Sequence, residues 1–177
     1  MKDKTRGEIN KAMSGSQKMQ IDMPCGVFYD LFNMILDLNG TITVDGGFVD
    51  GVVDRLKEVS EIMDVYVLTA DTGQTLDRLA EQLVEDCGIE IHRLESGRGD
   101  IQKLAFLERL GRDKTVAIGN GCNDALMLRE ARLGLCIIGT EGASIDALMA
   151  SDAVFFNICD AIDIFLKPKR MIATLRK

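Results

Sequence analysis

Short apolar runs alternate along the chain with longer segments in which apolar residues recur every three or four positions. The runs cover residues 33–38, 65–69, 89–94, 115–118 and 135–138, and 154–156 is a candidate sixth. Short apolar runs between turn signals are typical of buried strands, and the longer period is typical of amphipathic helices. The alternation therefore predicts βαβ units with a parallel sheet covered on both faces. Right-handed crossovers would make this a doubly wound, Rossmann-like α/β fold.

Polar residues and glycines mark the expected helix ends. Asp50, Thr72 and Asp100 are candidate N-caps, and Gly88 and Gly111 are placed to end helices. Each helix has a predicted inner face of apolar residues. These are Val53, Leu56 and Val59 in the first, Leu76, Leu79, Ala80 and Leu83 in the second, and Ile101, Leu104, Ala105 and Leu107 in the third.

Two segments lie outside this alternation. Residues 19–23 and 27–32 flank Pro24-Cys25-Gly26 and predict a β-hairpin. Residues 1–17 are rich in Lys, Ser and Gly, which predicts a flexible leader. Residues 18–177 are then expected to form one domain.

Composition and charge narrow the classes of partner. Hydrophobic residues make up 46% of the chain and the formal net charge is −7. An acidic surface repels nucleic acid and anionic membranes, so we expect neither as a partner. No apolar run reaches the length of a membrane span, and no two of the five cysteines have CxxC spacing. We therefore expect a cytoplasmic protein with reduced thiols and no zinc site.

Candidate chemistry lies at the carboxyl ends of the predicted strands, where open α/β sheets bind ligands. Asp37 ends the first strand and is followed by Asn39-Gly40-Thr41. A carboxylate facing a turn with free backbone N–H groups can attack a phosphate that the turn holds. The alternative is an ordinary strand-to-turn junction, where Asp, Asn and Gly are common.

Two further residues suit phosphate binding. The hydroxyl of Thr69 can donate to a phosphate oxygen, although Asp71 and Thr72 can equally cap the next helix. Lys103 can neutralise a phosphoryl group, although most lysines on a helix surface are simply solvated.

The glycine turn 119–124, with Asp124 one helical turn in, suits Mg²⁺. A dinucleotide turn would need a third glycine, and a purely structural turn is the other alternative. His92 has no evident link to Cys122, so a Cys–His pair is poorly supported.

The order of these segments resembles the haloacid dehalogenase (HAD) superfamily over residues 33–157. Within this superfamily, the chain is most similar to the phosphorylation domain of P-type ATPases. It also resembles the free-standing hydrolases that are similar to this domain. Residues 37–43 (DLNGTIT) resemble DKTGTLT, Thr69-Ala70-Asp71 resembles TGD, and residues 119–124 (GNGCND) resemble GDGxND.

The resemblance implies a Mg²⁺-dependent phosphatase that acts through an aspartyl-phosphate on Asp37. The phosphoryl oxygens would be bound by Gly40, Thr41, Thr69, Ala70 and Lys103. Asp37, the backbone carbonyl of Asn39, Asn120 and Asp124 would hold Mg²⁺, and Asn123 would support the loop.

The chain departs from the family pattern in three places. Asn39 stands where family phosphatases carry an acid–base Asp, and an amide cannot transfer a proton at neutral pH. Asn120 replaces the first Asp of the metal loop. Neither gap between the motifs holds an inserted lid, so a capless site is expected.

These departures keep alternatives open. A nearly inactive phosphate-binding or regulatory module would explain Asn39 and Asn120, and a receiver-type signalling domain is a further, weaker alternative. An open site also suggests a homo-oligomer, in which the hairpin or the basic tail (169–177) of one copy roofs another, or a bulky substrate. The alternative is that both segments pack onto their own chain. The sequence predicts a phosphorylated substrate but does not name it.

Overall fold

The computed structural model describes residues 19–24, 26–70 and 74–176, with no side-chain description for 74–78. The expected leader (1–17) and the candidate cap Thr72 lie outside the described residues.

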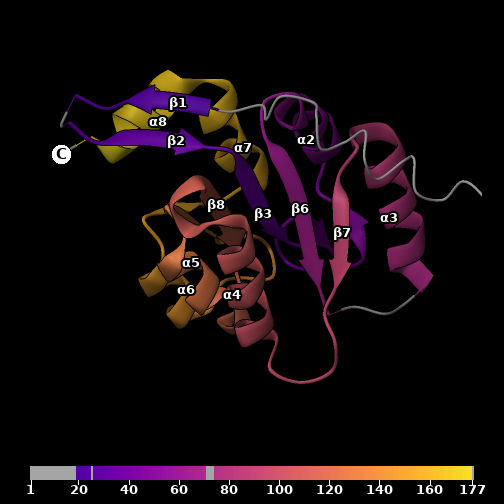
Figure 1. Ribbon diagram of the computed structural model, residues 1–177. Helices are drawn as coiled ribbons and strands as arrows, with labels where there is room; N and C mark the ends of the chain where they lie inside the picture. The colour runs from indigo at the N-terminus through magenta and orange to yellow at the C-terminus, as the bar shows by residue number, and fades with distance from the viewer. Residues whose placement is uncertain (1–18, 25, 71–73, 177) are drawn as a thin grey trace, which may run out of the picture.

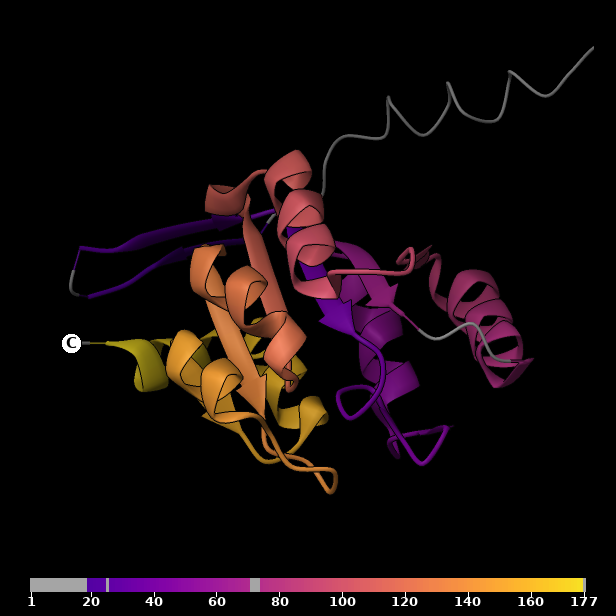
Figure 2. The same ribbon diagram turned by 90° about the horizontal axis from the view of Figure 1, so that it is seen from below.

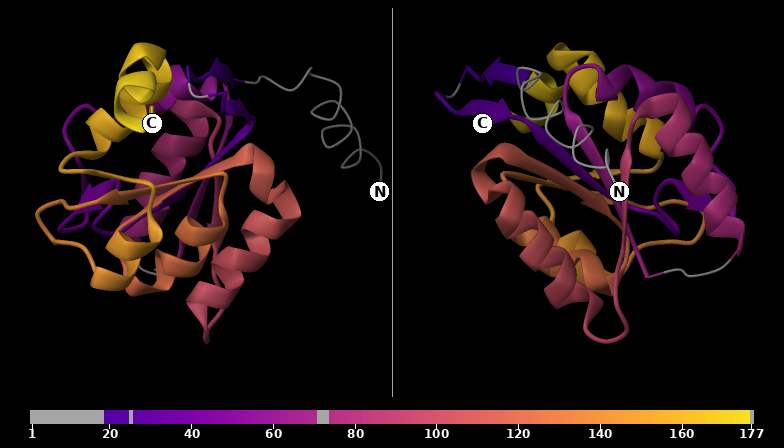
Figure 3. Two further views of the ribbon diagram at one scale, coloured as in Figure 1. Left: turned by 90° about the vertical axis from the view of Figure 1, so that its left-hand side faces the viewer. Right: turned by 45° about the vertical axis from the view of Figure 1, so that its right-hand side comes forward.

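Within the described residues, six strands form the central sheet, and all neighbouring pairs run parallel. Their order across the sheet is β10-β9-β8-β3-β6-β7. The bounds are β3 (Asn33–Asp37), β6 (Asp64–Thr69), β7 (Glu90–Arg93), β8 (Thr115–Gly119), β9 (Leu133–Ile137) and β10 (Ala153–Phe155). The doubly wound α/β prediction is confirmed, because helices lie between successive strands and cover both faces of the sheet (Figures 1 and 3).

The helices divide between two faces. One face carries α4 (Gly99–Leu110), α5 (Ala125–Glu130) and α6 (Ile145–Ala150), and the other carries α2 (Val52–Ser60), α3 (Gln74–Cys87), α7 (Ile158–Leu166) and α8 (Pro168–Leu175) (Figure 2). Alternation along β3 fills both cores. Leu36 packs in the α2–α7 core and Ile35 in the α4–α6 core. Asp37 lies two residues after Ile35 in the strand, so its side chain is on the same face of the sheet, the one that α4 covers.

Two predicted helix caps are wrong. Gly51 rather than Asp50 precedes α2, in a left-handed conformation with φ 75°. Arg98 is the N-cap residue of α4, and Asp100 lies in the first turn, where it accepts a hydrogen bond from Arg98 Nε at 2.8 Å. Side-chain capping depends on local φ and ψ, which the residue type alone does not determine. The glycine ends are confirmed, since Gly88 and Gly111 have positive φ at the ends of α3 and α4.

The hairpin is confirmed as β1 (Met19–Asp22) paired antiparallel with β2 (Phe28–Leu31). Met19, Ile21 and Leu31 are buried in the chain's own core, as is Met171 of α8. The hairpin and α8 therefore pack onto their own chain, at the end of the sheet where β3 begins (Figure 1). Most of the apolar surface of the hairpin and α8, which suggested an oligomer interface, is therefore covered. A homo-oligomer stays a prediction. Among the described residues, no helix combines the length and apolar character of a membrane span.

Candidate active site

The nucleophile turn, residues 37–43, follows the central strand β3. Asp37 ends this strand between β6 and β8, and its side chain is 12% exposed. The carbonyl of Leu38 then accepts hydrogen bonds from the backbone N–H groups of Ile42 and Thr43, which closes the turn. Gly40 has φ 75°, and a Cβ there would lie 2.4 Å from Asn120 Nδ2. The turn therefore requires glycine at this position for both backbone and space.

Lys103 joins the turn to the loop that follows β8. It lies one turn into α4, is fully buried, and its Nζ donates to Asp37 Oδ1 and, at 2.6 Å, to Asp124 Oδ1. A buried ammonium needs paired anions, and these two carboxylates supply them. The structure thus brings together Asp37, Lys103 and Asp124 from three separate elements, as the motif order predicted.

Burial and charge shift the acid–base properties of this cluster. Burial, followed by repulsion from Asp124, raises the pKa of Asp37 from 3.8 to about 7, although Lys103 opposes the shift. Burial disfavours the charged form of Lys103, but Asp37 and Asp124 outweigh it and raise the pKa of the ammonium. One ammonium thus faces two carboxylates, and a further cation would relieve the repulsion between them.

Asp124 holds the loop that carries it. Its Oδ2 accepts hydrogen bonds from the backbone N–H groups of Asn120 (3.0 Å) and Gly121 (2.8 Å). A Cβ at Gly119 would lie 2.4 Å from Asp124 Cγ, so a side chain at that position would displace the carboxylate. Asn123, the expected loop support, is exposed in the 3₁₀ turn (Cys122–Asp124) that precedes α5. The carboxylate of Asp124 thus supplies two of the hydrogen bonds that hold the loop.

Asn120 links the two loops through its side chain. Its Oδ1 accepts from Thr41 Oγ1 at 3.2 Å, and its Nδ2 donates to the carbonyl of Gly142 at 3.1 Å. The oxygen expected to hold Mg²⁺ therefore already has a donor, and metal binding by Asn120 stays a prediction.

The remaining predicted residues lie around this cluster. Thr69 is buried at the end of β6, one residue beyond the partner of Asp37 in the strand register. Ala70 follows it and is exposed. Asn39 is also exposed, and its Oδ1 accepts a long hydrogen bond from Thr43 Oγ1 at 3.4 Å. Their contacts with a phosphate stay predictions.

Sequence reasoning missed the contribution of the loop between β9 and α6. Its Gly142 accepts from Asn120, and Ser144 N–H donates to the Asn120 carbonyl at 2.8 Å. Glu141 accepts from the backbone N–H of Asp45, at the tip of the flap formed by β4 (Thr43–Val44) and β5 (Gly47–Phe48). The available signal was the position of this loop, directly after the carboxyl end of a strand.

Mg²⁺ fits the donor set at this site. Asp37 and Asp124 converge on one point, since both contact the same ammonium. No group of three His, Cys, Asp or Glu side chains that could hold a metal occurs in the part of the chain that the structure describes. Such a site suits Mg²⁺, which binds one or two carboxylates and takes its other oxygens from backbone, water and substrate.

Sequence comparison finds relatives without an assigned activity. No protein-family model matches the chain. The uncharacterized protein MJ0073 of Methanocaldococcus jannaschii is 42% identical over 92 residues, which cover 50% of this chain and 99% of the relative. The uncharacterized protein MJ0072 of the same organism is 46% identical over 41 residues, 23% of this chain and 93% of the relative.

Solved structures with the same fold include HAD phosphatases. The cobalt-bound deoxy-D-mannose-octulosonate 8-phosphate phosphatase of Haemophilus influenzae matches with a TM-score of 0.62 and 16% identity, over 83% of this chain and 94% of that chain. The 3-deoxy-D-manno-octulosonate 8-phosphate phosphatase of Moraxella catarrhalis, solved with magnesium and phosphate ions and a KDO molecule, matches with a TM-score of 0.59 and 16% identity. That match covers 82% of this chain and 94% of the other. The chain thus belongs to the family of the uncharacterized M. jannaschii protein MJ0073, and it has the fold of the HAD superfamily hydrolases.

Proposed function

We propose that this protein is a Mg²⁺-dependent phosphomonoester hydrolase that acts through an aspartyl-phosphate on Asp37. The observation that carries the proposal is the buried ammonium of Lys103, held between the carboxylates of Asp37 and Asp124. A fully buried lysine paired with two acids at the carboxyl edge of a parallel sheet is costly for stability, which is typical of a functional site. The HAD phosphatases with this fold support the same chemistry.

In the proposed reaction, a carboxylate oxygen of Asp37 attacks phosphorus and the bond from phosphorus to the leaving oxygen breaks. The leaving oxygen takes a proton from water, and a second water later cleaves the aspartyl-phosphate to release phosphate. Lys103 and Thr69 would stabilise the charge on the phosphoryl oxygens. Mg²⁺, held by Asp37, Asp124 and the Asn39 carbonyl, would add positive charge at the same oxygens.

Asn39 defines which esters this site can cleave well. An amide cannot protonate a departing oxygen at neutral pH, and loss of a general acid costs on the order of 10²–10⁴ in rate. Aryl phosphates need little protonation as they leave, so we expect faster turnover of aryl than of alkyl phosphates. The same deficiency would slow hydrolysis of the aspartyl-phosphate. Slow hydrolysis of this intermediate would be a feature shared with the P-type ATPase phosphorylation domains that the motifs resemble.

Beryllofluoride with Mg²⁺ tests the proposed site, because it mimics a phosphoryl group on an aspartate. The full chain should gain thermal stability with both present, since a ligand that binds only the native state stabilises it. Asp37→Asn should abolish the shift, whereas the matched Asp64→Asn change, at an exposed carboxylate on β6, should retain it. A shift that survives in Asp37→Asn would place the phosphate site elsewhere.

A further inference from the structure

A segment that follows β9 is bound to the loop after β8 at two points. We call this segment, residues 139–146, the clamp. The carbonyl of Gly142 accepts from Asn120 Nδ2 at 3.1 Å, and the backbone N–H of Ser144 donates to the Asn120 carbonyl at 2.8 Å. The clamp therefore holds Asn120 through both its side chain and its main chain.

The clamp is braced by hydrogen bonds of its own. The backbone N–H of Gly142 donates to the Gly139 carbonyl at 2.9 Å, which closes a tight turn in which Gly142 has φ 80°. Ser144 caps α6, because its Oγ accepts from the backbone N–H of Ala147 at 3.0 Å. These bonds fix the two groups that bind Asn120.

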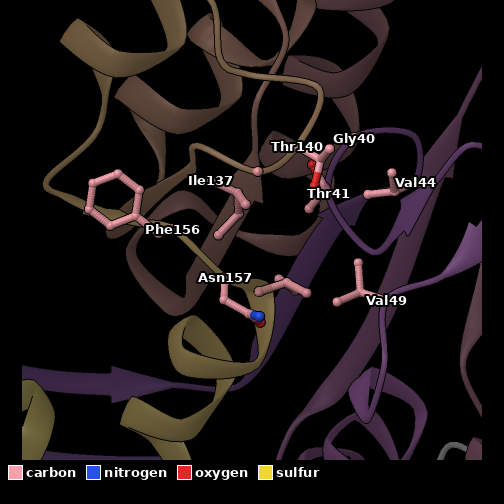
Figure 4. Close-up of a pocket in the computed structure, with 10 residues that line it drawn as sticks. Gly40, Thr41, Val44, Val49, Ile137, Thr140, Phe156 and Asn157 are labelled. Carbon is pink, nitrogen blue, oxygen red and sulfur yellow. The ribbon is translucent and has the colours of Figure 1, made fainter.

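The other side of the Asn120 amide contacts the nucleophile turn. Its Oδ1 accepts from Thr41 Oγ1 at 3.2 Å, and its Nδ2 lies so close to Gly40 that a Cβ there would come within 2.4 Å. Figure 4 shows Gly40 and Thr41 close to Thr140 of the clamp, and all three line one pocket. A single amide thus connects the turn to the clamp.

The partners of this amide account for an asparagine where the HAD pattern has an aspartate. The Gly142 carbonyl requires a donor, and the amide nitrogen supplies one. A carboxylate at this position has only acceptor oxygens, so one of them would face the carbonyl oxygen and repel it. Asn120 can therefore satisfy the turn and the clamp together, and an ionised aspartate cannot.

We infer that Asn120 is a positioning residue that holds the nucleophile turn against the clamp, rather than a ligand of Mg²⁺. The inference rests on the proposed function, because the group that is positioned is the attacking carboxylate of Asp37. Asp37 and Gly40 belong to the same turn, so a shift of this turn moves the carboxylate relative to a bound phosphoryl group. A displacement of about 1 Å can cost on the order of 10² in rate.

Native-state hydrogen exchange of the full chain, with a chelator present, tests the connection without phosphate or metal. In Asn120→Ala, the backbone N–H groups of Ser144 in the clamp and Ile42 in the turn should exchange at least about ten-fold faster, because the two loops can separate. Asn157→Ala is the control, since the Oδ1 of this exposed asparagine accepts from Cys159 N–H within α7, and it should leave both rates unchanged. Unchanged exchange of either amide in a folded Asn120→Ala chain would overturn the inference.

Phosphorylation of Asp37 by acetyl phosphate separates positioning from metal binding. In Asn120→Ala, the rate at saturating Mg²⁺ should fall at least about ten-fold, because the attacking group is misplaced. The Mg²⁺ concentration that gives half of this rate should change by less than about three-fold, because no metal ligand is lost. A half-saturating Mg²⁺ concentration raised by about ten-fold or more would show that Asn120 binds the metal and would refute the inference.

Thr41→Val tests the same connection from the turn, because it removes the hydroxyl that donates to Asn120. It should also slow phosphorylation of Asp37 by about ten-fold, and the double variant Thr41→Val/Asn120→Ala should be no slower than the slower single variant, since both changes break one link. Effects that multiply in the double variant would contradict the inference. If Asn120→Ala fails to fold, a Thr41→Val chain that is phosphorylated at the unaltered rate would contradict it as well.

The inference and the proposed function can fail separately. If the unaltered chain is not phosphorylated on Asp37, the proposed function fails. The hydrogen-exchange rates of Ser144 and Ile42 still decide whether Asn120 holds the two loops together, because that measurement requires no phosphoryl transfer.

Discussion

Asp37→Asn should stabilise the metal-free protein at pH 8, although it removes the proposed nucleophile. The folded chain raises the pKa of Asp37 from 3.8 to about 7 by burial and by repulsion from Asp124, with Lys103 opposing. Between these values the folded state holds a proton that the unfolded state has lost, so stability falls as pH rises. At about 1.4 kcal/mol per pKa unit, the full pKa shift lowers the free energy of unfolding by about 4 kcal/mol at pH 8.

Asparagine resembles the protonated carboxyl and does not carry this penalty. Urea denaturation in the presence of a chelator should therefore show Asp37→Asn more stable than the unaltered chain by about 4 kcal/mol at pH 8. At pH 5 the gain should shrink to about 1–2 kcal/mol, because only the part of the pKa shift between 3.8 and 5 contributes there. Asp64→Asn, at an exposed carboxylate, serves as the control. If Asp37→Asn were no more stable at pH 8 than the unaltered chain, the electrostatic reasoning would be refuted.

Three further changes probe the surrounding contacts. Gly40→Ala should lower the free energy of unfolding, measured by urea denaturation, by about 1–3 kcal/mol, because it adds a clash with Asn120 to a positive φ. The control Gly26→Ala, at φ 77° with nothing within 4 Å of the added Cβ, should cost less. Equal costs at the two positions would contradict the clash. Lys103→Met should destabilise the chain by about 3–5 kcal/mol at pH 8, since it leaves two buried carboxylates unpaired, and by less at pH 5; a loss independent of pH would point to packing alone. Asn39→Asp should speed hydrolysis of alkyl phosphates more than that of aryl phosphates in steady-state assays, and equal effects on both would show that this position does not supply the missing acid.

The sequence predicts the fold well because strand and helix periodicity are set by burial. The order of Asp37, Thr69, Lys103 and Asp124 on successive units also places them at one sheet edge, since parallel strands share their carboxyl end. Local detail was harder to predict. The pattern placed Ile101 on the buried face of its helix, yet Ile101 is 48% exposed and Lys103 is buried. Lys103 can be buried because two carboxylates distant in sequence, Asp37 and Asp124, contact its ammonium. The periodicity of apolar residues carries no information about such distant partners.

The hydrogen bonds of Asn120 could not be predicted for a similar reason. Its partners Thr41 and Gly142 lie 79 residues before and 22 residues after it. They come together only because β3, β8 and β9 are neighbours in the sheet. Motif comparison assigned this residue to the metal, whereas the structure ties its amide to the nucleophile turn and to the loop after β9.

The central claim is that Asp37 accepts a phosphoryl group, and acetyl phosphate tests it most directly. The full chain, incubated with acetyl phosphate and Mg²⁺ and quenched in acid, should carry one phosphoryl group that mass spectrometry of its peptides locates on Asp37. The modification should disappear in Asp37→Asn, persist in Asp64→Asn, and accumulate less in Asn39→Asp, because a restored base speeds hydrolysis. A chain that stays unmodified, or that is phosphorylated at another residue, would contradict the account.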